Sequence, residues 1–411
     1  MAGVVIAGGG QAGFQVAASL RQLGYDGDVT IVSEEARLAY QRPPLSKTYI
    51  KTDADFDTLL LRPESFYEKN RIAFRGGERV VSIDRGASAV TLSTGETIPY
   101  DHLVVATGAS NRSLPVPGAT LAGVHQLRSA EDAEHLRAGV AEARTIAIIG
   151  GGFIGLEVAA AVRALGKDVV LLEAADRLMG RTVSREVSAF FLDRHLQMET
   201  DIRLGTALQA IEGTDRATAI RTAAGETIAA DLVLIAAGVT PNDALARAAG
   251  LTVDNGIVVD AFMTTSDPKI FAIGDCAAFD SPFAERRVRL ESVQNAVDQA
   301  KTVAARIMGT AEPYRSVPWF WSDQGPFKLQ IVGLTAGADH VEVARIGEEG
   351  KLIAYCFKGE SLLGIETVNR PGEHMLGRRI LGQDLKIARA DVAHHAFELK
   401  AHVAKLMAEA G

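Results

Sequence analysis

The chain contains only two cysteines, Cys276 and Cys356, among its 411 residues. Two cysteines so far apart cannot supply a C-x-x-C redox pair, the ligand spacing of a zinc site or a disulfide framework. We therefore expect no metal site, and we expect both thiols to be inert residues of the core.

Long apolar runs and a surplus of positive charge are also missing. The longest apolar stretch, Ile146 to Leu156, is rich in glycine and meets Glu157, so it is too short to span a bilayer. The first residues, MAGVVIAGGGQAG, lack the basic region of a signal peptide, and their apolar letters already serve as a strand. A formal net charge of −8 disfavours an overall polyanion-binding surface. We expect a cytoplasmic protein that binds neither membranes nor nucleic acid.

Glycine, by contrast, is plentiful. The chain has 40 Gly against 13 Pro, and 47% of its residues are apolar, which is typical of a globular protein. At 411 residues, two to three domains are expected.

The stretch from Ile146 to Glu173 predicts a strand, a glycine turn, a helix and a second strand. Gly150 permits the tight turn, Gly152 lets a pyrophosphate approach the backbone, and Gly155 lets the helix pack closely on the strand. The phosphates would lie at the helix N-terminus, where free N–H groups favour anions. Ile154, within the same turn, is a further candidate for cofactor binding.

Glu173 decides which nicotinamide cofactor this unit prefers. It follows the second strand, where a carboxylate can accept a hydrogen bond from the 2′-hydroxyl of an adenosine ribose. The same carboxylate about 4 Å from a 2′-phosphate would repel it by roughly 1 to 4 kcal/mol. The sequence therefore favours NADH, although three glycines beside a buried strand can also be simple turn residues.

The first 34 residues repeat this unit, with VVIAGGGQAGFQVAASLRQLG matching IAIIGGGFIGLEVAAAVRALG. Gly8, Gly10 and Gly13 correspond to the three glycines of the second copy, so two adenine dinucleotides are expected. The match places Ser33 opposite the second copy's glutamate. We therefore choose Glu34 as the ribose ligand, with Glu35 as the fallback and a solvated acidic turn as the alternative.

Two coupled dinucleotide units suggest a flavin and a nicotinamide. Residues 100–108 predict a buried strand that ends in the small-residue turn Ala106, Thr107 and Gly108, and residues 231–238 repeat this pattern up to Gly238. A third buried strand ends at Gly274 and Asp275. Asp275 is well placed to accept from a flavin ribityl hydroxyl, or else to cap the next helix.

Together with two further strings, these motifs resemble the pyridine nucleotide-dependent flavoprotein reductases, and closely the NADH-dependent ferredoxin reductases of the putidaredoxin reductase type. The two strings, which are more specific than the glycine motifs, are RPPLSK at 42–47 and PWFWSDQ at 318–324. The resemblance covers nearly the whole chain. It implies an α/β fold of the glutathione reductase-like architecture, with two Rossmann-like dinucleotide-binding domains and a C-terminal α+β domain.

The resemblance also implies where the domains begin and end. The FAD-binding domain would comprise residues 1–110 and 242–316, the NADH-binding domain residues 111–241, and the C-terminal domain residues 317–411, with a last helix over 393–410. Composition alone does not predict that the first domain is discontinuous.

Lys47 and Glu157 would, by the same resemblance, meet beside flavin N5. An ammonium there stabilises the negative charge that a flavin gains on reduction, and the carboxylate holds the ammonium in place. The alternatives are a surface lysine after a proline turn and a first-turn helix carboxylate. Trp321 would cover the flavin, although core packing is the ordinary fate of such a tryptophan. The other contacts implied by the resemblance come from Ala12, Arg42, Val80, Arg128 and Val293.

The implied activity is that of a ferredoxin–NAD(+) reductase, which is an oxidoreductase and electron-transport flavoprotein. Relatives that reduce disulfides or peroxides relay electrons through cysteines near the flavin, and this chain has none there. The flavin would instead pass electrons singly to a [2Fe-2S] ferredoxin that supplies a cytochrome P450 or a Rieske-type ring-hydroxylating oxygenase. Rubredoxin reductase is a rival, and a flavoprotein of the apoptosis-inducing-factor type is another. Candidate basic residues for docking an acidic ferredoxin are Arg62, Arg315, Lys328, Arg378, Arg379 and Lys405.

Overall fold

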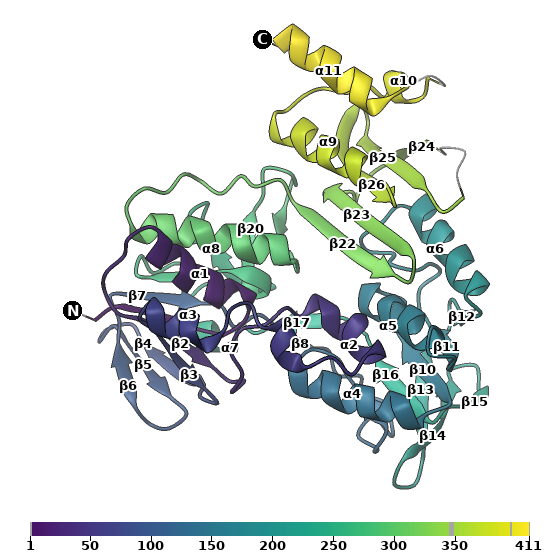
Figure 1. Cartoon of the computed structure of the whole chain (residues 1–411), viewed down its shortest axis with the longest axis horizontal. Helices are drawn as coiled ribbons and strands as arrows, with labels where there is room; N and C mark the ends of the chain where they lie inside the picture. Colours follow the sequence, from purple (N-terminus) through teal and green to yellow (C-terminus); the bar gives the residue numbers. More distant parts are fainter. Residues whose placement is uncertain (1, 345–348, 395–396, 411) are drawn as a thin grey trace. The chain divides into compact units, whose positions relative to one another are not determined.

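The computed structural model describes residues 2–344, 349–394 and 397–410, and the chain forms two compact units (Figure 1). The first unit comprises residues 1–41, 55–110 and 239–316, and the second comprises residues 42–54, 111–238 and 317–411. The chain leaves the first unit through β8 (Ala109–Asn111) and returns through β17 (Val239–Pro241), and these two short strands pair with each other. The domain boundaries expected from the sequence stay a prediction.

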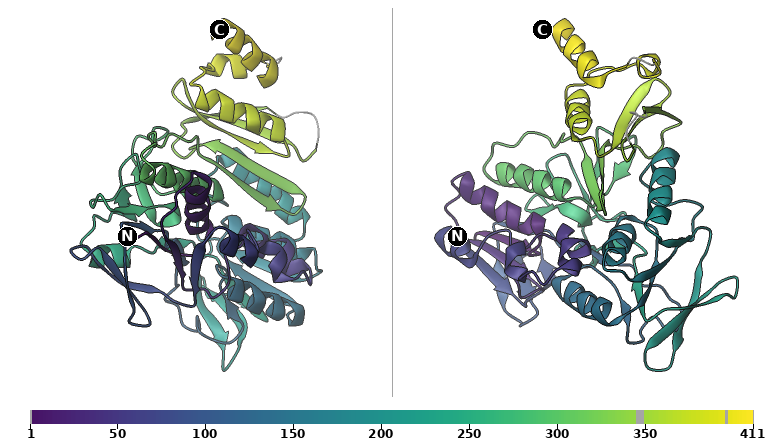
Figure 2. Two further views of the ribbon diagram at one scale, coloured as in Figure 1. Left: turned by 60° about the vertical axis from the view of Figure 1, so that its left-hand side comes forward. Right: turned by 45° about the vertical axis from the view of Figure 1, so that its right-hand side comes forward.

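A five-stranded sheet in the order β19-β7-β1-β2-β3 forms the centre of the first unit, and its neighbouring strands are parallel. The strands are β1 (Val4–Ala7), β2 (Val29–Ser33), β3 (Ile72–Gly76), β7 (His102–Val105) and β19 (Ile270–Ala272). Helices α1 (Gln11–Gln22) and α8 (Val293–Ile307) lie side by side in all views (Figure 2). The strand residues are almost fully buried, as expected for a parallel sheet covered by other elements.

Two small sheets and several short helices complete this unit. One sheet contains β4 (Val80–Asp84), β5 (Ala89–Leu92) and β6 (Thr97–Pro99), and the other contains β18 (Ile257–Val259), β20 (Ala277–Asp280) and β21 (Arg287–Val288). The short helices are η2 (Phe56–Leu59), α3 (Glu64–Lys69), α7 (Ala244–Ala248) and η3 (Gly274–Cys276).

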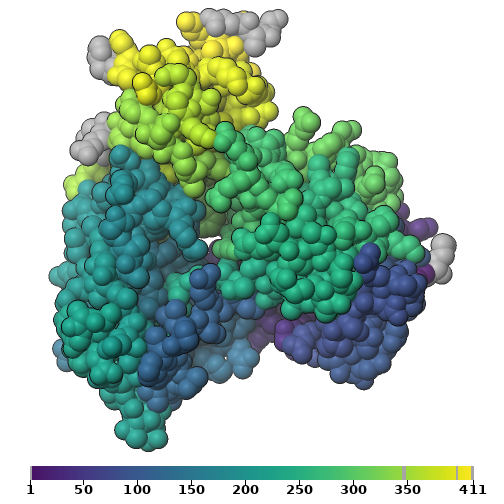
Figure 3. All heavy atoms as spheres, turned by 180° about the vertical axis from the view of Figure 1, so that it is seen from behind, coloured from purple at the N-terminus to yellow at the C-terminus, as the bar shows by residue number. Residues whose placement is uncertain are grey.

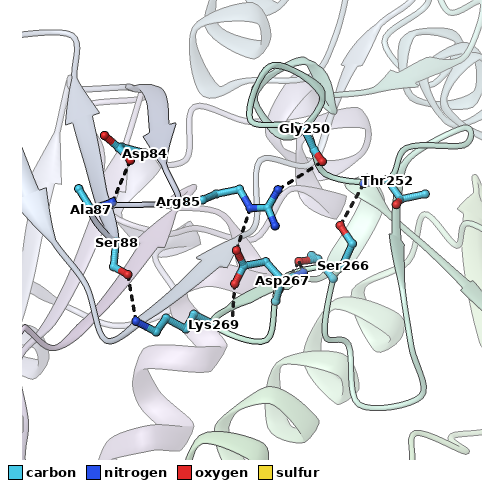
Figure 4. A network of polar contacts seen from close by, with 10 residues as sticks. Asp84, Arg85, Ala87, Ser88, Gly250, Thr252, Ser266, Asp267 and Lys269 are labelled. Carbon is cyan, nitrogen blue, oxygen red and sulfur yellow. Dashed lines mark hydrogen bonds and ion pairs between the residues drawn. The ribbon is translucent and has the colours of Figure 1, made fainter.

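A polar network ties the β4–β5 turn to the segment that precedes β19 (Figure 4). Arg85 Nε donates to Asp267 Oδ2 at 2.8 Å, and Lys269 Nζ donates to Ser88 Oγ at 3.0 Å. Partial burial opposes ionisation of Asp267, but the hydrogen bonds from Arg85 and from the Lys269 backbone outweigh it, so the pKa of Asp267 lies below its ordinary value. The network therefore stabilises the unit most when this carboxyl is ionised.

The second unit repeats the parallel arrangement with the order β12-β11-β10-β16-β9. The strands are β9 (Val124–His125), β10 (Thr145–Ile149), β11 (Asp168–Leu172), β12 (Asp201–Arg203) and β16 (Leu232–Ile235). The helices are η1 (Pro43–Ser46), α2 (Thr48–Lys51), α4 (Ala130–Glu142), α5 (Phe153–Arg163) and α6 (Arg185–Gln197). An antiparallel sheet of β13 (Leu208–Gly213), β14 (Ala217–Thr222) and β15 (Thr227–Ala229) belongs to the same unit, and its teal tip projects at the lower left of Figure 3.

The C-terminal part of this unit is an antiparallel sheet in the order β22-β23-β26-β25-β24. Its strands are β22 (Trp319–Gln324), β23 (Phe327–Gly333), β24 (His340–Ala344), β25 (Leu352–Lys358) and β26 (Ser361–Val368), and the helices α9 (Pro371–Gly382), α10 (Arg389–Val392) and α11 (Leu399–Ala410) follow. The expected last helix is too long, because it begins only at Leu399. Phe397 packs its ring on Tyr355 before the helix starts, at a centroid distance of 5.7 Å, and residues 395–396 lie outside the described ranges.

Glu366 of β26 fixes the start of α6 against this sheet. Its carboxylate accepts from Ser184 Oγ at 2.6 Å and from Thr335 Oγ1 at 2.7 Å. Ser184 is the N-cap of α6. Burial raises the pKa of Glu366, while the hydrogen bonds from Ser184 and Thr335 act in the opposite direction. These hydrogen bonds hold the N-terminal end of α6, the helix that carries His195.

Candidate functional site

The two glycine turns have the same geometry, each within its own unit. Gly8 and Gly150 adopt φ values of +127° and +115°, which side chains rarely tolerate. A Cβ on Gly13 would lie 1.9 Å from the carbonyl oxygen of Gly8, so helix and turn could not pack as they do. A Cβ on Gly10 would meet nothing within 4 Å, and the same holds for Gly152. The second glycine of each turn thus faces open space, where a pyrophosphate fits.

The helices that follow these turns suit an anion. Helix α1 begins directly after Gly10 and α5 directly after Gly152, and neither helix has an acidic residue in its first turn. Ile154, in the first turn of α5, leaves 43% of its surface exposed beside the turn. The residues present therefore fit two dinucleotides, as the sequence predicts.

Ser33 and Glu173 occupy equivalent positions at the carboxyl end of the second strand of each repeat, which confirms the expected match. The backbone N–H of Gly8 donates to the residue before Ser33, and that of Gly150 donates to the residue before Glu173, both at 2.8 Å. Glu173 Oε2 accepts from the backbone N–H of Gly151 at 2.7 Å. The carboxylate is therefore held against the glycine turn of the second unit, where a ribose would lie.

Glu34 and Glu35, the two acidic residues after β2, differ from each other in their surroundings. Glu34 is 74% exposed and pairs with Arg79 at 3.4 Å. Glu35 Oε2 accepts from Tyr40 Oη at 2.6 Å. Glu34 therefore has the more accessible carboxylate, and its assignment as a ribose ligand stays a prediction.

Small residues line the carboxyl ends of the central strands of the first unit. Thr107, after β7, donates through Oγ1 to Asn242 O at 2.7 Å. Gly274, after β19, has φ +73° and donates its N–H to Gln299 Oε1 at 2.7 Å. Asp275 lies within η3, and the N-cap of α8 is Ser292 instead. Ligands of open parallel sheets bind at this edge, so these turns suit a cofactor.

Lys47 and Glu157 form an ion pair in the second unit. Lys47 follows η1, Glu157 lies on α5, and the distance from Nζ to Oε2 is 2.7 Å. The carboxylate is 3% exposed and the lysine side chain 15%. Nζ also donates to Pro43 O at 3.1 Å. Among the described residues Nζ has no third partner, so one N–H of the ammonium can serve a further acceptor.

A chain of neutral polar groups continues from this pair. Ser322 Oγ donates to Glu157 Oε1 at 2.7 Å, and Gln324 Nε2 lies 3.3 Å from Ser322 Oγ. Gln324 Oε1 lies 2.9 Å from His195 Nε2. Burial lowers the pKa of His195, while the hydrogen bond with Gln324 acts in the opposite direction. Ser322, Gln324 and His195 are almost inaccessible to solvent.

Sequence reasoning missed this chain of residues. Ser322 and Gln324 belong to the PWFWSDQ string but received no role, and His195 resembles an ordinary buried histidine of a helix. The alternation of β22 could have revealed two of them, because Phe320, Ser322 and Gln324 must share one face of the strand. Phe320 packs on Phe153 of α5 at a centroid distance of 4.5 Å.

The remaining candidates fall in one unit or the other. Arg42 donates to the carbonyl oxygen of Arg128, so these two expected phosphate contacts lie together. Trp321 is half-buried, and its ring centroid lies 5.5 Å from that of Trp319. The candidates of the first unit are Gly8, Gly10, Ala12, Gly13, Glu34, Val80, Ala106, Thr107, Gly108, Gly274, Asp275 and Val293. Those of the second unit are Arg42, Lys47, Arg128, Gly150, Gly152, Ile154, Gly155, Glu157, Glu173, Gly238 and Trp321.

Both cysteines are free and fully buried, as expected. Burial raises the pKa of Cys276 and of Cys356, so neither forms a thiolate readily. Among the described residues, no group of histidine, cysteine and carboxylate side chains could hold a metal ion, and no helix is both long and apolar enough to cross a membrane.

Most of the basic residues expected at a docking surface are accessible. Arg378 is half-buried, with its guanidinium 5.0 Å from the ring centroid of Trp319. The exposed ones are Arg62, Arg315, Lys328, Arg379 and Lys405.

Two dinucleotide turns, a buried lysine–glutamate pair and an added antiparallel domain define a class of nucleotide-dependent oxidoreductase. Residues 2–300 match the family model described as pyridine nucleotide-disulphide oxidoreductase, and residues 319–403 match the reductase C-terminal model. The chain belongs to the pyridine nucleotide-disulphide oxidoreductase family, and the expected α/β fold is confirmed.

Several proteins within this class are similar to the chain over nearly its whole length. Rhodocoxin reductase of Rhodococcus erythropolis is 49% identical over 403 residues, which span 98% of this chain and 94% of that protein. Putidaredoxin reductase of Pseudomonas putida is 39% identical over 412 residues, which span 99% and 98% of the two chains. The crystal structure of a ferredoxin reductase for the CYP199A2 system of Rhodopseudomonas palustris matches with a TM-score of 0.95 and 46% identity, over 98% of this chain and all of that one.

Proposed function

We propose that this protein is an FAD-containing, NADH-dependent ferredoxin reductase that passes electrons singly to a [2Fe-2S] ferredoxin, which in turn supplies a cytochrome P450 or a ring-hydroxylating oxygenase. The observation that carries the proposal is the buried pair of Lys47 and Glu157, which lies in the same unit as the glycine turn for the nicotinamide cofactor. The similarity to reductases that serve such oxygenase systems supports the choice of partner.

The glycine turns would hold the two dinucleotides by their phosphates. The turn with Gly8 would hold the FAD pyrophosphate, and the turn with Gly150 that of NADH. Glu173, fixed by Gly151, would accept from the adenosine ribose and disfavour a 2′-phosphate. Arg42 and Arg128 would contact phosphate, and Trp321 would cover the flavin ring.

A bound flavin supplies the chemistry that accepts a hydride from NADH and releases electrons one at a time. Lys47 would present a positive charge to the reduced ring, which lowers the cost of the charge that it gains. Glu157 would hold the ammonium in one position and limit its field. No proton transfer by either residue is required.

A ferredoxin assay tests this proposal. The purified protein is given NADH, a candidate [2Fe-2S] ferredoxin and cytochrome c as the final acceptor, with a rubredoxin in parallel. We expect turnover that requires the ferredoxin and falls steeply with added salt, because basic side chains such as Arg379 would steer an acidic partner. A flat salt response would remove the steering argument, and a colourless protein that takes up no flavin would overturn the proposal.

The parallel reaction with rubredoxin distinguishes the proposed function from a second candidate function. Rubredoxin-NAD(+) reductase of Pseudomonas putida is 41% identical over 370 residues, so a rubredoxin is a reasonable alternative acceptor. Faster reduction of rubredoxin than of any tested ferredoxin would assign the protein to that role. A cytoplasmic location is part of the proposal, because NADH and ferredoxins are met there, and cell fractionation tests it.

A further inference from the structure

Glu157 receives hydrogen bonds on both of its carboxylate oxygens. Ser46 Oγ donates to Oε2 at 2.5 Å, and Ser322 Oγ donates to Oε1 at 2.7 Å. The ammonium of Lys47 is the third donor, 2.7 Å from Oε2. The three donors come from η1, from the residue that follows it and from β22, and they enclose a carboxylate that is 3% exposed.

The hydroxyls of Ser46 and Ser322 keep the Glu157 carboxylate hydrogen-bonded when the Lys47 ammonium moves. A buried carboxylate whose only partner is a lysine becomes an uncompensated charge when that partner turns away. Here each oxygen keeps one neutral donor. The lysine side chain, 15% exposed, can therefore direct its charge to another acceptor without leaving the carboxylate unpaired.

The hydrogen bonds that run from His195 through Gln324 and Ser322 all have the same direction, toward Glu157. Because the Ser322 hydroxyl donates to the carboxylate, its oxygen can accept from Gln324 Nε2, which lies 3.3 Å away. Gln324 Oε1 must then accept from His195, and this assigns the histidine proton to Nε2. Hydrogen bonds aligned in one direction polarise one another, so this chain stabilises a negative charge at its end.

We propose that Ser46 and Ser322 are positioning residues that hold the Glu157 carboxylate in place while the Lys47 ammonium serves the bound flavin, and that Gln324 and His195 orient the Ser322 hydroxyl. The inference rests on the proposed function, because that function places Lys47 at the flavin. It adds four residues to the site, none of which would touch the cofactor in this role.

Substitution of Ser322 tests the proposal through the hydrogen bonding of the Glu157 carboxylate. In the flavin-loaded protein carrying ¹³C-labelled glutamate, isotope-edited infrared spectra show the carboxylate stretching bands, whose positions depend on the hydrogen bonds that the two oxygens accept. Ser322→Ala removes the donor to Oε1 and should shift the Glu157 bands away from their original positions. Ser322→Thr retains the hydroxyl and should restore the original positions. Glu157→Gln identifies the bands, because it removes them.

A double-mutant cycle examines the role of the hydroxyl when the lysine charge is gone. Lys47→Met alone should leave a carboxylate that still has two hydroxyl donors, whereas Lys47→Met with Ser322→Ala leaves one. The double variant should shift the carboxylate bands by more than the sum of the two single shifts, because the hydroxyl matters most when the ammonium is absent.

The matched control is Ser188→Ala, which removes another buried serine from the same unit. Ser188 lies on α6 seven residues before His195, about 10 Å along the helix. It should leave the carboxylate bands unchanged. If Ser322→Ala does not fold, Ser46→Ala removes the other hydroxyl, and a shift of the carboxylate bands is again expected.

Unchanged carboxylate bands in a folded hydroxyl-deletion variant, or a failure of Ser322→Thr to restore their original positions, overturns the inference. The readout needs neither ferredoxin nor turnover. A protein that shows the shift but reduces no ferredoxin would therefore refute the proposed function and leave the positioning role intact, while the opposite result would refute only the positioning role.

Discussion

Replacement of Glu173 by arginine should exchange the preference of the protein between the two nicotinamide cofactors. The carboxylate is fixed beside the glycine turn of the second unit by the backbone N–H groups of Gly151, at 2.7 Å from Oε2, and of Ala175, at 2.8 Å from Oε1. It therefore cannot swing away easily from a 2′-phosphate. Glu173→Arg removes a repulsive charge and introduces one that attracts phosphate.

The size of the effect follows from the charges and the hydrogen bonds. A repulsion of roughly 1 to 4 kcal/mol at about 4 Å corresponds to a tenfold to thousandfold change in relative affinity. The substitution also removes an acceptor from two backbone N–H groups. Because Glu173 is half-buried and water can replace part of these bonds, we expect a loss of about 1 to 3 kcal/mol in the free energy of unfolding.

The assay compares kcat/KM for NADPH and for NADH, with ferricyanide as the acceptor. Glu173→Gln separates the removal of negative charge from the gain of positive charge and should produce a smaller shift toward NADPH. Glu142→Arg, at the exposed end of α4, makes the same change in net charge away from the glycine turn and should have no effect on the ratio. An unchanged ratio in Glu173→Arg would show that this carboxylate does not contact the ribose.

Three further predictions concern pH and the thiols. Burial, followed by the charges of Arg378 and Lys328, lowers the pKa of His374 to about 4 from 6.5, so the stability that depends on its neutral form is complete above pH 6.5 and is lost as the pH falls toward 4. Water screens the charges of Arg378 and Lys328 and reduces their effect on this pKa. We therefore expect His374→Leu to remove about 1 to 3 kcal/mol of the pH dependence of the stability, which chemical denaturation at several pH values measures. Asp267→Asn should reduce the loss of thermal stability below pH 3.8, since the native carboxyl is held ionised in the folded protein. If the network of Figure 4 contributed nothing, the melting temperatures of the two proteins would fall in parallel as the pH is lowered. Replacing Cys276 and Cys356 together by alanine should preserve ferredoxin reduction, and a loss of turnover in a folded variant would reveal a sulfur relay.

The glycine turns and the strands and helices around them could be predicted from the sequence because each depends on residues that are close together in the chain. The spacing of Gly150, Gly152 and Gly155 predicts one strand–turn–helix unit, and its repetition near the N-terminus predicts the other. The match of Ser33 with Glu173 also followed from this local repetition.

The polar chain behind Lys47 could not be predicted in this way. Ser46 and Glu157 are 111 positions apart, and Ser322 and Glu157 are 165 apart, so only the packing of η1 and of β22 on α5 brings their side chains together. The resemblance to known reductases supplied the meeting of Lys47 and Glu157, but it assigned no role to the hydroxyls. A buried histidine such as His195 gives no signal in the sequence, because burial and hydrogen bonding are properties of the fold.

Strand β22 imposes a strict condition on changes in length near the site. Phe320, Ser322 and Gln324 contact α5 and α6, whereas Trp319 and Trp321 alternate with them. Insertion of one residue between Phe320 and Trp321 would turn the Trp321 indole toward the helices and send the Ser322 hydroxyl and the Gln324 amide to the other side. Insertions in the loop before β22 would avoid this reversal, so relatives of this protein should vary in loop length there and keep the hexapeptide itself unbroken.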